Sequence, residues 1–216
     1  MRKFLNAIAF VIFAWLIPGT VNAFEDGTLL FVQNGHNLVE YYTKSSYSHV
    51  AIVIDNHVYQ AEPPRIRVQG LDEWFVDVAH FNEGRGSPAI VEVMVPAKKY
   101  NKKEVAAMKK FLDEQVDRRY SIRGYVRKMP GDGIHCAEMC SQAIAMSGRA
   151  DFSEPYKLSP GDLHDFVVES HKSGTMLYVK TKPEYRRGTC ERWGDWWDKR
   201  WVSCKWSCRE TMAFCR

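Results

Sequence analysis

Three residues of the kinds that serve in covalent catalysis stand at the ends of predicted strands and helices. His49 and Glu62 begin and end the stretch HVAIVIDNHVYQAE, and Cys136 follows a glycine-containing loop at residues 131–133. A cysteine in this position begins a predicted helix, where unpaired backbone N–H groups and the helix dipole stabilise a thiolate. The same N–H groups can bind the oxyanion that forms when a thiolate attacks a carbonyl carbon. The pattern therefore favours nucleophilic catalysis by Cys136.

A thiolate nucleophile needs a base that takes the thiol proton and later protonates the leaving group. The residue order predicts His49 as this base and Glu62, on the neighbouring strand, as the group that holds the imidazole in the required tautomer. His135 is expected to line the cleft rather than act as the base, because adjacent helical side chains do not face one another. Two alternatives for Cys136 stay open: a buried structural thiol, and a disulfide with a C-terminal cysteine. Cys140, one turn later, is predicted to be a buried core residue.

A mixed set of strands and helices must bring these positions together. Asp55-Asn56 is a turn signal that joins two predicted strands into a hairpin, and Pro63-Pro64 ends the second of them. Runs of apolar, β-branched and aromatic residues predict strands over residues 28–33, 49–54, 57–61, 89–95 and 175–180.

Two longer helices are predicted after most of the strands. Residues 101–116 carry apolar side chains at helical spacing, and Asn101 with Glu104 has the pattern of a capping box. A second helix is predicted over residues 136–147, and the turn at residues 158–163 leads into a short helix. Strands that precede helices without βαβ alternation predict an α+β fold, with an antiparallel sheet packed against helices and the nucleophile at a helix N-terminus.

The first 23 residues have the pattern of a cleaved signal peptide. Arg2 and Lys3 precede an almost wholly apolar run at residues 4–17, Pro18 breaks this run, and cleavage is expected after Ala23. An uncleaved membrane anchor is the alternative, although a helix that spans a bilayer needs about 20 apolar residues. We therefore expect a mature protein that is periplasmic or secreted.

The C-terminal region, residues 180–216, differs in composition from the catalytic domain expected over residues 24–179. Its net charge is +5, whereas residues 24–179 carry −3 and the whole chain carries +4. In an exported protein its four cysteines predict two disulfides, for which three pairings are possible, and a zinc site is the alternative. These cysteines are Cys190, Cys204, Cys208 and Cys215.

Tryptophans at positions 193, 196, 197 and 201 share one face of a predicted helix in this region. One interpretation is a helix that packs on the domain and is held there by the disulfides. The other is a face that docks on a membrane surface or a cell-wall polymer, because Trp prefers boundaries between apolar and wet surroundings and the region is basic. The sequence carries no nucleic-acid motif, so no nucleic-acid partner is expected. No metal or cofactor is expected in the catalytic domain.

Four short motifs, taken in order, resemble the circularly permuted papain-like hydrolases of the NlpC superfamily. They are Ser48-His49-Val-Ala-Ile-Val-Ile54, Ala61-Glu62, His135-Cys136-Ala-Glu138 and Leu158-Ser-Pro-Gly-Asp-Leu163. The chain is most similar to the YiiX/YaeF/YebB-like group, and its motif order is more distantly similar to that of lecithin:retinol acyltransferase. The resemblance spans residues 26–166. It implies a permuted papain-like fold, in which the His-bearing strand precedes the Cys-bearing helix.

The resemblance implies the same three catalytic roles that the residue types suggest. It also implies a tyrosine ahead of the nucleophile, and Tyr120 is the nearest match. Tyr120 and His135 are therefore expected at the substrate or oxyanion position. The glycine that precedes this tyrosine in the family is absent here, and Ser121 replaces the acid that follows it.

The expected function is that of an exported cysteine hydrolase, an amidase or peptidase that works through an acyl-enzyme. Cell-wall peptide such as peptidoglycan is the substrate class that the resemblance implies, and a lipid-linked amide or ester is the second. An acyltransferase would differ only in the acceptor that resolves the acyl-enzyme. A non-catalytic secreted binding protein on the same scaffold is the alternative from a different class.

Overall fold

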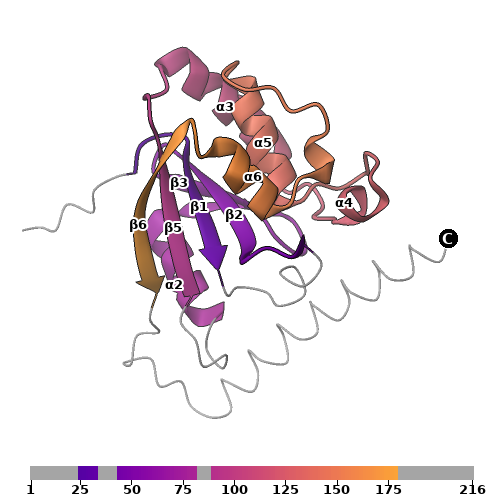
Figure 1. The fold of residues 1–216 in the computed structure, drawn as a ribbon, viewed down its shortest axis with the longest axis horizontal. Helices are drawn as coiled ribbons and strands as arrows, with labels where there is room; N and C mark the ends of the chain where they lie inside the picture. The colour runs from indigo at the N-terminus through magenta and orange to yellow at the C-terminus, as the bar shows by residue number, and fades with distance from the viewer. Residues whose placement is uncertain (1–23, 34–42, 82–88, 180–216) are drawn as a thin grey trace, which may run out of the picture.

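The computed structural model describes residues 24–33, 43–81 and 89–179, which form a six-stranded antiparallel sheet with helices on both of its faces (Figure 1). The strand order across the sheet is β4-β3-β2-β1-β5-β6. The strands are β1 (Thr28–Gln33), β2 (Tyr47–Ile54), β3 (His57–Ala61), β4 (Ile66–Gly70), β5 (Ala89–Pro96) and β6 (His171–Val179). The predicted α+β class is confirmed.

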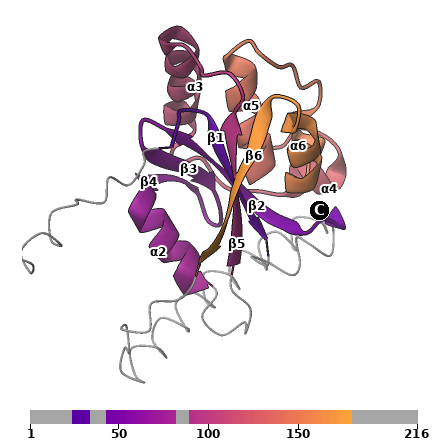
Figure 2. The same cartoon turned by 60° about the vertical axis from the view of Figure 1, so that its left-hand side comes forward.

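Three helices cover one face of the sheet (Figure 2): α3 (Lys102–Gln115), α5 (Cys136–Met146) and α6 (Pro160–Val167). Alternate residues of the strands pack beneath them, because successive side chains of a strand point to opposite faces. We call this cluster the α5-side core. It includes Leu29, Phe31, Val50, Ile52, Ile54, Met108, Leu112, Ala137 and Met139.

The helix α2 (Leu71–Phe81) covers the other face (Figure 2). The indole of Trp74 is fully buried there against the remaining strand positions. We call this cluster the α2-side core. It includes Leu30, Val32, Ala51, Val53, Val58 and Leu71. Because successive residues of a strand point alternately into the two cores, the position of a polar residue along its strand decides on which face of the sheet its side chain lies.

The hairpin between β2 and β3 is confirmed. Asp55 and Asn56 have φ angles of 55° and 58°, the left-handed conformation that a two-residue hairpin turn requires and that Asp and Asn tolerate. The turn fixes the register, so that Ile54 pairs with His57 and Ala51 pairs with Gln60. The ladder stops at the second of these pairs, and His49 lies beyond it.

The N-termini of the helices α3 and α6 are capped by side chains that are close in the sequence. The side chain of Asn101 accepts the backbone N–H of Glu104, whose carboxylate accepts the N–H of Asn101, so the predicted capping box is confirmed. Ser159 and Asp162 form a second capping box at the start of α6. Two short helices, α4 (Arg123–Arg127) and η1 (Pro155–Lys157), connect the longer ones.

Two elements, β4 and α2, were not predicted. Only Ile66 and Gln69 of the edge strand β4 are buried, so the strand lacks the alternation that reveals a half-buried strand. Other boundaries differ by a few residues: β2 begins at Tyr47 rather than at His49, and β6 begins at His171 rather than at residue 175.

The predicted signal peptide and the C-terminal region, with its four cysteines and tryptophan face, lie outside the described residues. Within the described ranges, no helix combines the length and apolar character needed to cross a membrane.

Candidate active site

Cys136 is the first residue of α5, as predicted, and carries a free thiol. Cys136 as a residue is 5% exposed, whereas Cys140, one turn further along the helix, is fully buried. Burial raises the pKa of the Cys140 thiol well above its ordinary value, which favours a neutral core residue. The prediction that Cys140 is buried is confirmed. Both cysteines are buried, and Cys136 is the less completely buried of the two.

A loop that pairs with the preceding segment positions the start of α5. Tyr120 and Ile134 form a parallel bridge two residues before Cys136. The N–H of Tyr120 donates to the carbonyl of Pro64, just after β3, at 3.0 Å. These bonds tie the start of α5 to the end of β3. Tyr120 itself is 6% exposed and packs in the α5-side core.

Gly133 makes this pairing possible. A Cβ atom at position 133 would lie 2.4 Å from the Cβ of Ser121 and 3.0 Å from the carbonyl oxygen of Arg119. Real Cβ atoms do not approach other atoms so closely, and the two segments would have to separate. The glycine that precedes the nucleophile in the sequence is therefore required for close backbone approach.

His135 caps α5 instead of lining a cleft. Its Nδ1 accepts the backbone N–H of Glu138 at 3.4 Å, and its Nε2 lies 3.1 Å from the carbonyl oxygen of Tyr156. Because a carbonyl only accepts, Nε2 carries the proton and the imidazole is neutral. Burial lowers the pKa of His135 and raises the pKa of Glu138. Both ring nitrogens are occupied, so the expected contact of His135 with an oxyanion is corrected to a capping role.

His49 is half-buried, and its Nε2 lies 3.1 Å from Oε1 of Gln60 on β3. The N–H of the buried Trp74 indole donates to the same oxygen at 2.9 Å. Gln60 is 2% exposed, so this arrangement is largely shielded from water. The residue that holds the imidazole is therefore an amide that sequence reasoning passed over, two positions before the predicted carboxylate.

Glu62 forms an ion pair with Arg67 of β4. Both side chains are partly exposed, at 33% and 47%. The extended register would have placed Glu62 directly opposite His49, but the ladder between β2 and β3 ends at the Ala51 and Gln60 pair. The prediction that Glu62 orients His49 assumed this longer register. Because the ladder ends earlier, Gln60 contacts the imidazole instead.

The imidazole and the thiol come from different sides of the sheet. His49 pairs with Val32, whose side chain belongs to the α2-side core, whereas Cys136 packs in the α5-side core. Sγ of Cys140, one turn after Cys136 on α5, lies 3.9 Å from the carbonyl oxygen of Val50, the residue after His49 on β2. Among the described residues, no hydrogen bond joins Cys136 to His49.

A second histidine cluster lies under α6 and was missed. The hydroxyl of Tyr47 donates to Glu92, and Nε2 of His164 lies 3.2 Å from that hydroxyl and 3.4 Å from Oε2 of Glu92. Ser173 donates to the other carboxylate oxygen at 2.7 Å. Glu92 is 6% exposed and interrupts the apolar strand AIVEVMVP. A single glutamate within an otherwise apolar strand is the sequence feature that could have indicated this cluster.

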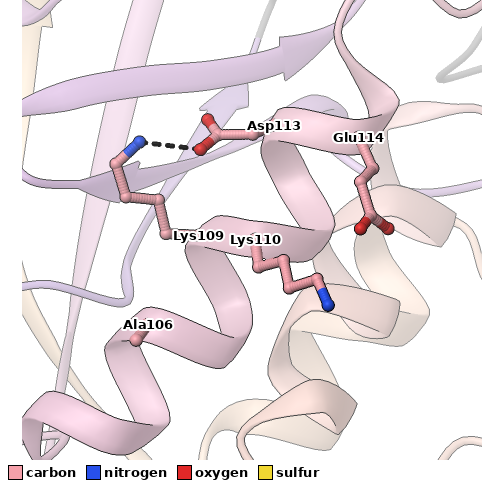
Figure 3. Close-up of a pocket in the computed structure, with 5 residues that line it drawn as sticks. All are labelled: Ala106, Lys109, Lys110, Asp113 and Glu114. Atoms are coloured by element: carbon pink, nitrogen blue, oxygen red, sulfur yellow. Dashed lines mark hydrogen bonds and ion pairs between the residues drawn. The ribbon is translucent and has the colours of Figure 1, made fainter.

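An open groove along α3 is lined by residues of that helix alone (Figure 3): Ala106, Lys109, Lys110, Asp113 and Glu114. Lys109 and Asp113 form an ion pair of 2.8 Å across it. Neither Cys136 nor His49 lines this groove. Alternating charges on one helix are typical of a solvated face, and the groove adds nothing to the candidate site.

Within the described residues, no group of three or more His, Cys, Asp or Glu side chains is arranged to hold a metal ion. Comparisons with protein-family models, curated proteins and solved structures found no match to this chain. The assignment of function therefore depends on the geometry around Cys136 and His49.

Proposed function

We propose that this protein is a cysteine hydrolase that cleaves amide bonds through an acyl-enzyme, with Cys136 as nucleophile, His49 as base and Gln60 as the residue that orients His49. The observation that carries the proposal is the hydrogen bond between His49 and Gln60. Because Oε1 of Gln60 also accepts the N–H of Trp74, this atom is an acceptor and Nε2 of His49 is the protonated nitrogen. The lone pair of Nδ1 is then available for a thiol proton.

The reaction follows from this tautomer. Nδ1 of His49 takes the thiol proton as Sγ of Cys136 attacks the carbonyl carbon of the substrate. The tetrahedral intermediate collapses when the imidazolium gives this proton to the departing amine, which leaves a thioester on Cys136. Water then attacks the thioester, again with His49 as base, and the thiol is regenerated as the acid product leaves.

The start of α5 supplies the electrostatic stabilisation. Backbone N–H groups at the first positions of a helix have no intrahelical partner and favour negative charge. His135 occupies the N–H of Glu138, so the N–H groups of Cys136 and Ala137 are the donors we assign to the oxyanion. Tyr120 lies beneath this loop, and we assign it a supporting role in the position of the helix start.

Proton transfer requires Sγ of Cys136 to approach Nδ1 of His49 to hydrogen-bond distance. In the free protein the imidazole faces the α2 side of the sheet and the thiol faces the α5 side, so this approach requires the His49 side chain or the end of β2 to move when substrate binds. His49 lies beyond the last β2–β3 pair, at the open end of this ladder, and Gln60 of β3 holds its Nε2. The contact would form around this end of the sheet.

The substrate class rests on the resemblance of the motifs to permuted papain-like hydrolases. We propose a peptide amide of the cell wall, for an exported protein in the periplasm or outside the cell, with a lipid-linked amide or ester as the second class. The order of β2, β3 and α5 supports the permuted arrangement, since the strand with the imidazole precedes the helix with the thiol.

The test is covalent labelling with an electrophilic amide probe, followed by mass spectrometry of the whole protein and of its peptides. We expect one adduct, located at Cys136, and no turnover of a peptide amide by the Cys136→Ala variant. Cys140→Ala is the matched control, because it removes the neighbouring buried thiol and should still be labelled. Turnover by Cys136→Ala, or labelling of Cys140 alone, would refute Cys136 as the nucleophile. Absence of both labelling and turnover in the wild-type protein would favour a binding protein on this scaffold.

A further inference from the structure

A chain of amide and carboxylate groups continues from Gln60 to the surface. Nε2 of Gln60 donates to Oε1 of Gln69 at 3.3 Å, and Nε2 of Gln69 donates to Oδ2 of Asp77 at 3.1 Å. Gln69 is 8% exposed, and Asp77 lies at the outer end of the chain on α2, with its side chain 46% exposed. The chain thus joins the half-buried imidazole of His49 to a carboxylate that meets solvent.

The direction of every hydrogen bond in this chain is determined from its ends. A carboxylate of Asp77 only accepts, so Gln69 must turn its NH₂ group outward and its oxygen toward Gln60. Gln60 must then turn its own NH₂ group toward Gln69 and its oxygen toward His49. The indole N–H of Trp74 only donates, and it requires the same orientation of Gln60 independently.

We propose that Gln69 and Asp77 are positioning residues that fix the tautomer of His49 through Gln60, an inference that rests on the proposed function. An amide has an oxygen and an NH₂ group of nearly equal shape, so an isolated glutamine can present either one to an imidazole. If Gln60 presented its NH₂ group, Nε2 would have to accept, Nδ1 would carry the proton, and His49 could no longer take a proton from the thiol.

This ambiguity arises only when the residue that orients the imidazole is an amide, as Gln60 is. Both oxygens of a carboxylate accept, so a carboxylate holds the Nε2–H tautomer in either orientation. Gln60 needs further groups to decide which atom faces the imidazole, and Gln69 and Asp77 meet this need together with the indole N–H of Trp74. Asp77 is held in turn by Arg67, whose guanidinium lies 3.7 Å from the carboxylate and also pairs with Glu62. Glu62, the carboxylate predicted to orient His49, is therefore connected to it through Arg67 and Asp77.

The experiment measures the tautomer of His49 by ¹⁵N NMR and kcat and KM for a peptide amide, in the full chain. The signals of His49 are assigned by their loss in His49→Gln. In Gln69→Leu we expect kcat to fall about tenfold with little change in KM, and the Nδ1–H tautomer of His49 to become detectable. Asp77→Ala, at an exposed position that the fold tolerates, should have the same effect at about threefold.

A conservative rescue separates positioning from packing. Glu at position 69 offers only acceptors to Gln60, so the double variant with Gln69→Glu and Asp77→Ala should regain the wild-type tautomer and most of kcat. Glu73→Ala, one turn earlier on α2, removes a comparable exposed carboxylate and should change neither readout.

The outcomes distinguish this inference from the proposed function. If Cys136→Ala is inactive while Gln69→Leu and Asp77→Ala keep the Nε2–H tautomer and the wild-type kcat, the positioning role is wrong and the hydrolase proposal stands. If Cys136→Ala turns over substrate, the hydrolase proposal is wrong, and a tautomer shift in the two variants would still show that the chain controls His49.

Discussion

Two histidines of this protein, His49 and His164, differ in how many of their ring nitrogens are occupied. His164 contacts Tyr47 and Glu92 through Nε2 and lies 3.3 Å from Asp165 through Nδ1. Its ring also stacks on Tyr47, with centroids 4.5 Å apart. Within the described part of the chain, His49 has one hydrogen bond, to the neutral amide of Gln60. A fully engaged imidazole stabilises the fold, whereas one with a free lone pair can exchange a proton.

A β-bulge separates the two clusters. Val32 pairs with His49 and Gln33 pairs with Tyr47, so Ser48 is the extra residue on β2. Without it, Tyr47 and His49, two positions apart, would share a face of the sheet. With it, Tyr47 packs on Phe31 in the α5-side core and His49 turns toward the α2-side core. One inserted residue thus divides a structural cluster from a candidate catalytic one.

Exchange of the two histidines for alanine is the strongest test of this comparison. His49→Ala should lower kcat about 10²- to 10⁴-fold, because the base is removed, with a change in unfolding free energy below about 1 kcal/mol. His164→Ala should lower the unfolding free energy by about 1–2 kcal/mol, because it removes the Tyr47 stack and a partner of Glu92, and leave kcat nearly unchanged. Urea unfolding and steady-state kinetics measure both effects.

The comparison fails if the pattern is reversed, with His164→Ala inactive and His49→Ala destabilised but active. Kinetics are measured well below the melting temperature of each variant, so that loss of folded protein does not count as loss of catalysis.

The next effect concerns Glu92. Tyr47 and Ser173 each donate to a different oxygen of this buried carboxylate, so the NH₂ group of a glutamine would face a donor on either side. Glu92→Gln should therefore lower the unfolding free energy by about 2 kcal/mol. Glu114→Gln, an exposed position on α3, is the control and should change it by less than about 0.5 kcal/mol. Equal effects of the two substitutions would show that the Glu92 cluster is not structural.

A smaller effect distinguishes Gln60 from Glu62 as the residue that orients His49. Gln60→Ala should lower kcat about 10- to 100-fold, whereas Glu62→Ala should lower it less than about threefold. Gln60→Glu keeps acceptor oxygens for both His49 and Trp74 and should retain more activity than Gln60→Ala. If Glu62→Ala causes the larger loss, the original sequence prediction is right and the assignment to Gln60 is wrong.

The smallest effect is the pH dependence of stability. Burial alone would raise the pKa of Glu92, but hydrogen bonds from Tyr47 and Ser173 and the charge of His164 outweigh it, so its pKa lies below the ordinary 4.5. A lowered pKa contributes stability that is complete above the unfolded value and is lost as the pH falls through the folded value. The stability difference between wild type and Glu92→Gln should therefore shrink as the pH falls below about 4.5. A difference that stays constant from pH 7 to pH 3 would contradict this account.

Local patterns predicted the hairpin, the capped helix α3 and the start of α5 at Cys136, because each depends on residues that are close in the sequence. The capping box of Asn101 and the turn at Asp55 and Asn56 are complete within a few residues. The edge strand β4 and the helix α2 were missed, because they are defined by packing against β3 and the α2-side core.

The types and order of the reactive groups could be read from the amino-acid sequence: an imidazole on a strand, then a thiol at the start of a helix. The polar residue that holds this imidazole follows from the folded sheet, because the choice between Gln60 and Glu62 depends on where the β2–β3 ladder ends. The folded sheet also decided that, among the described residues, contacts occupy both ring nitrogens of His164 but only Nε2 of His49, since the bulge at Ser48 turns Tyr47 and His49 to opposite faces of the sheet. Register and facing are properties of paired strands, and no single strand encodes them alone.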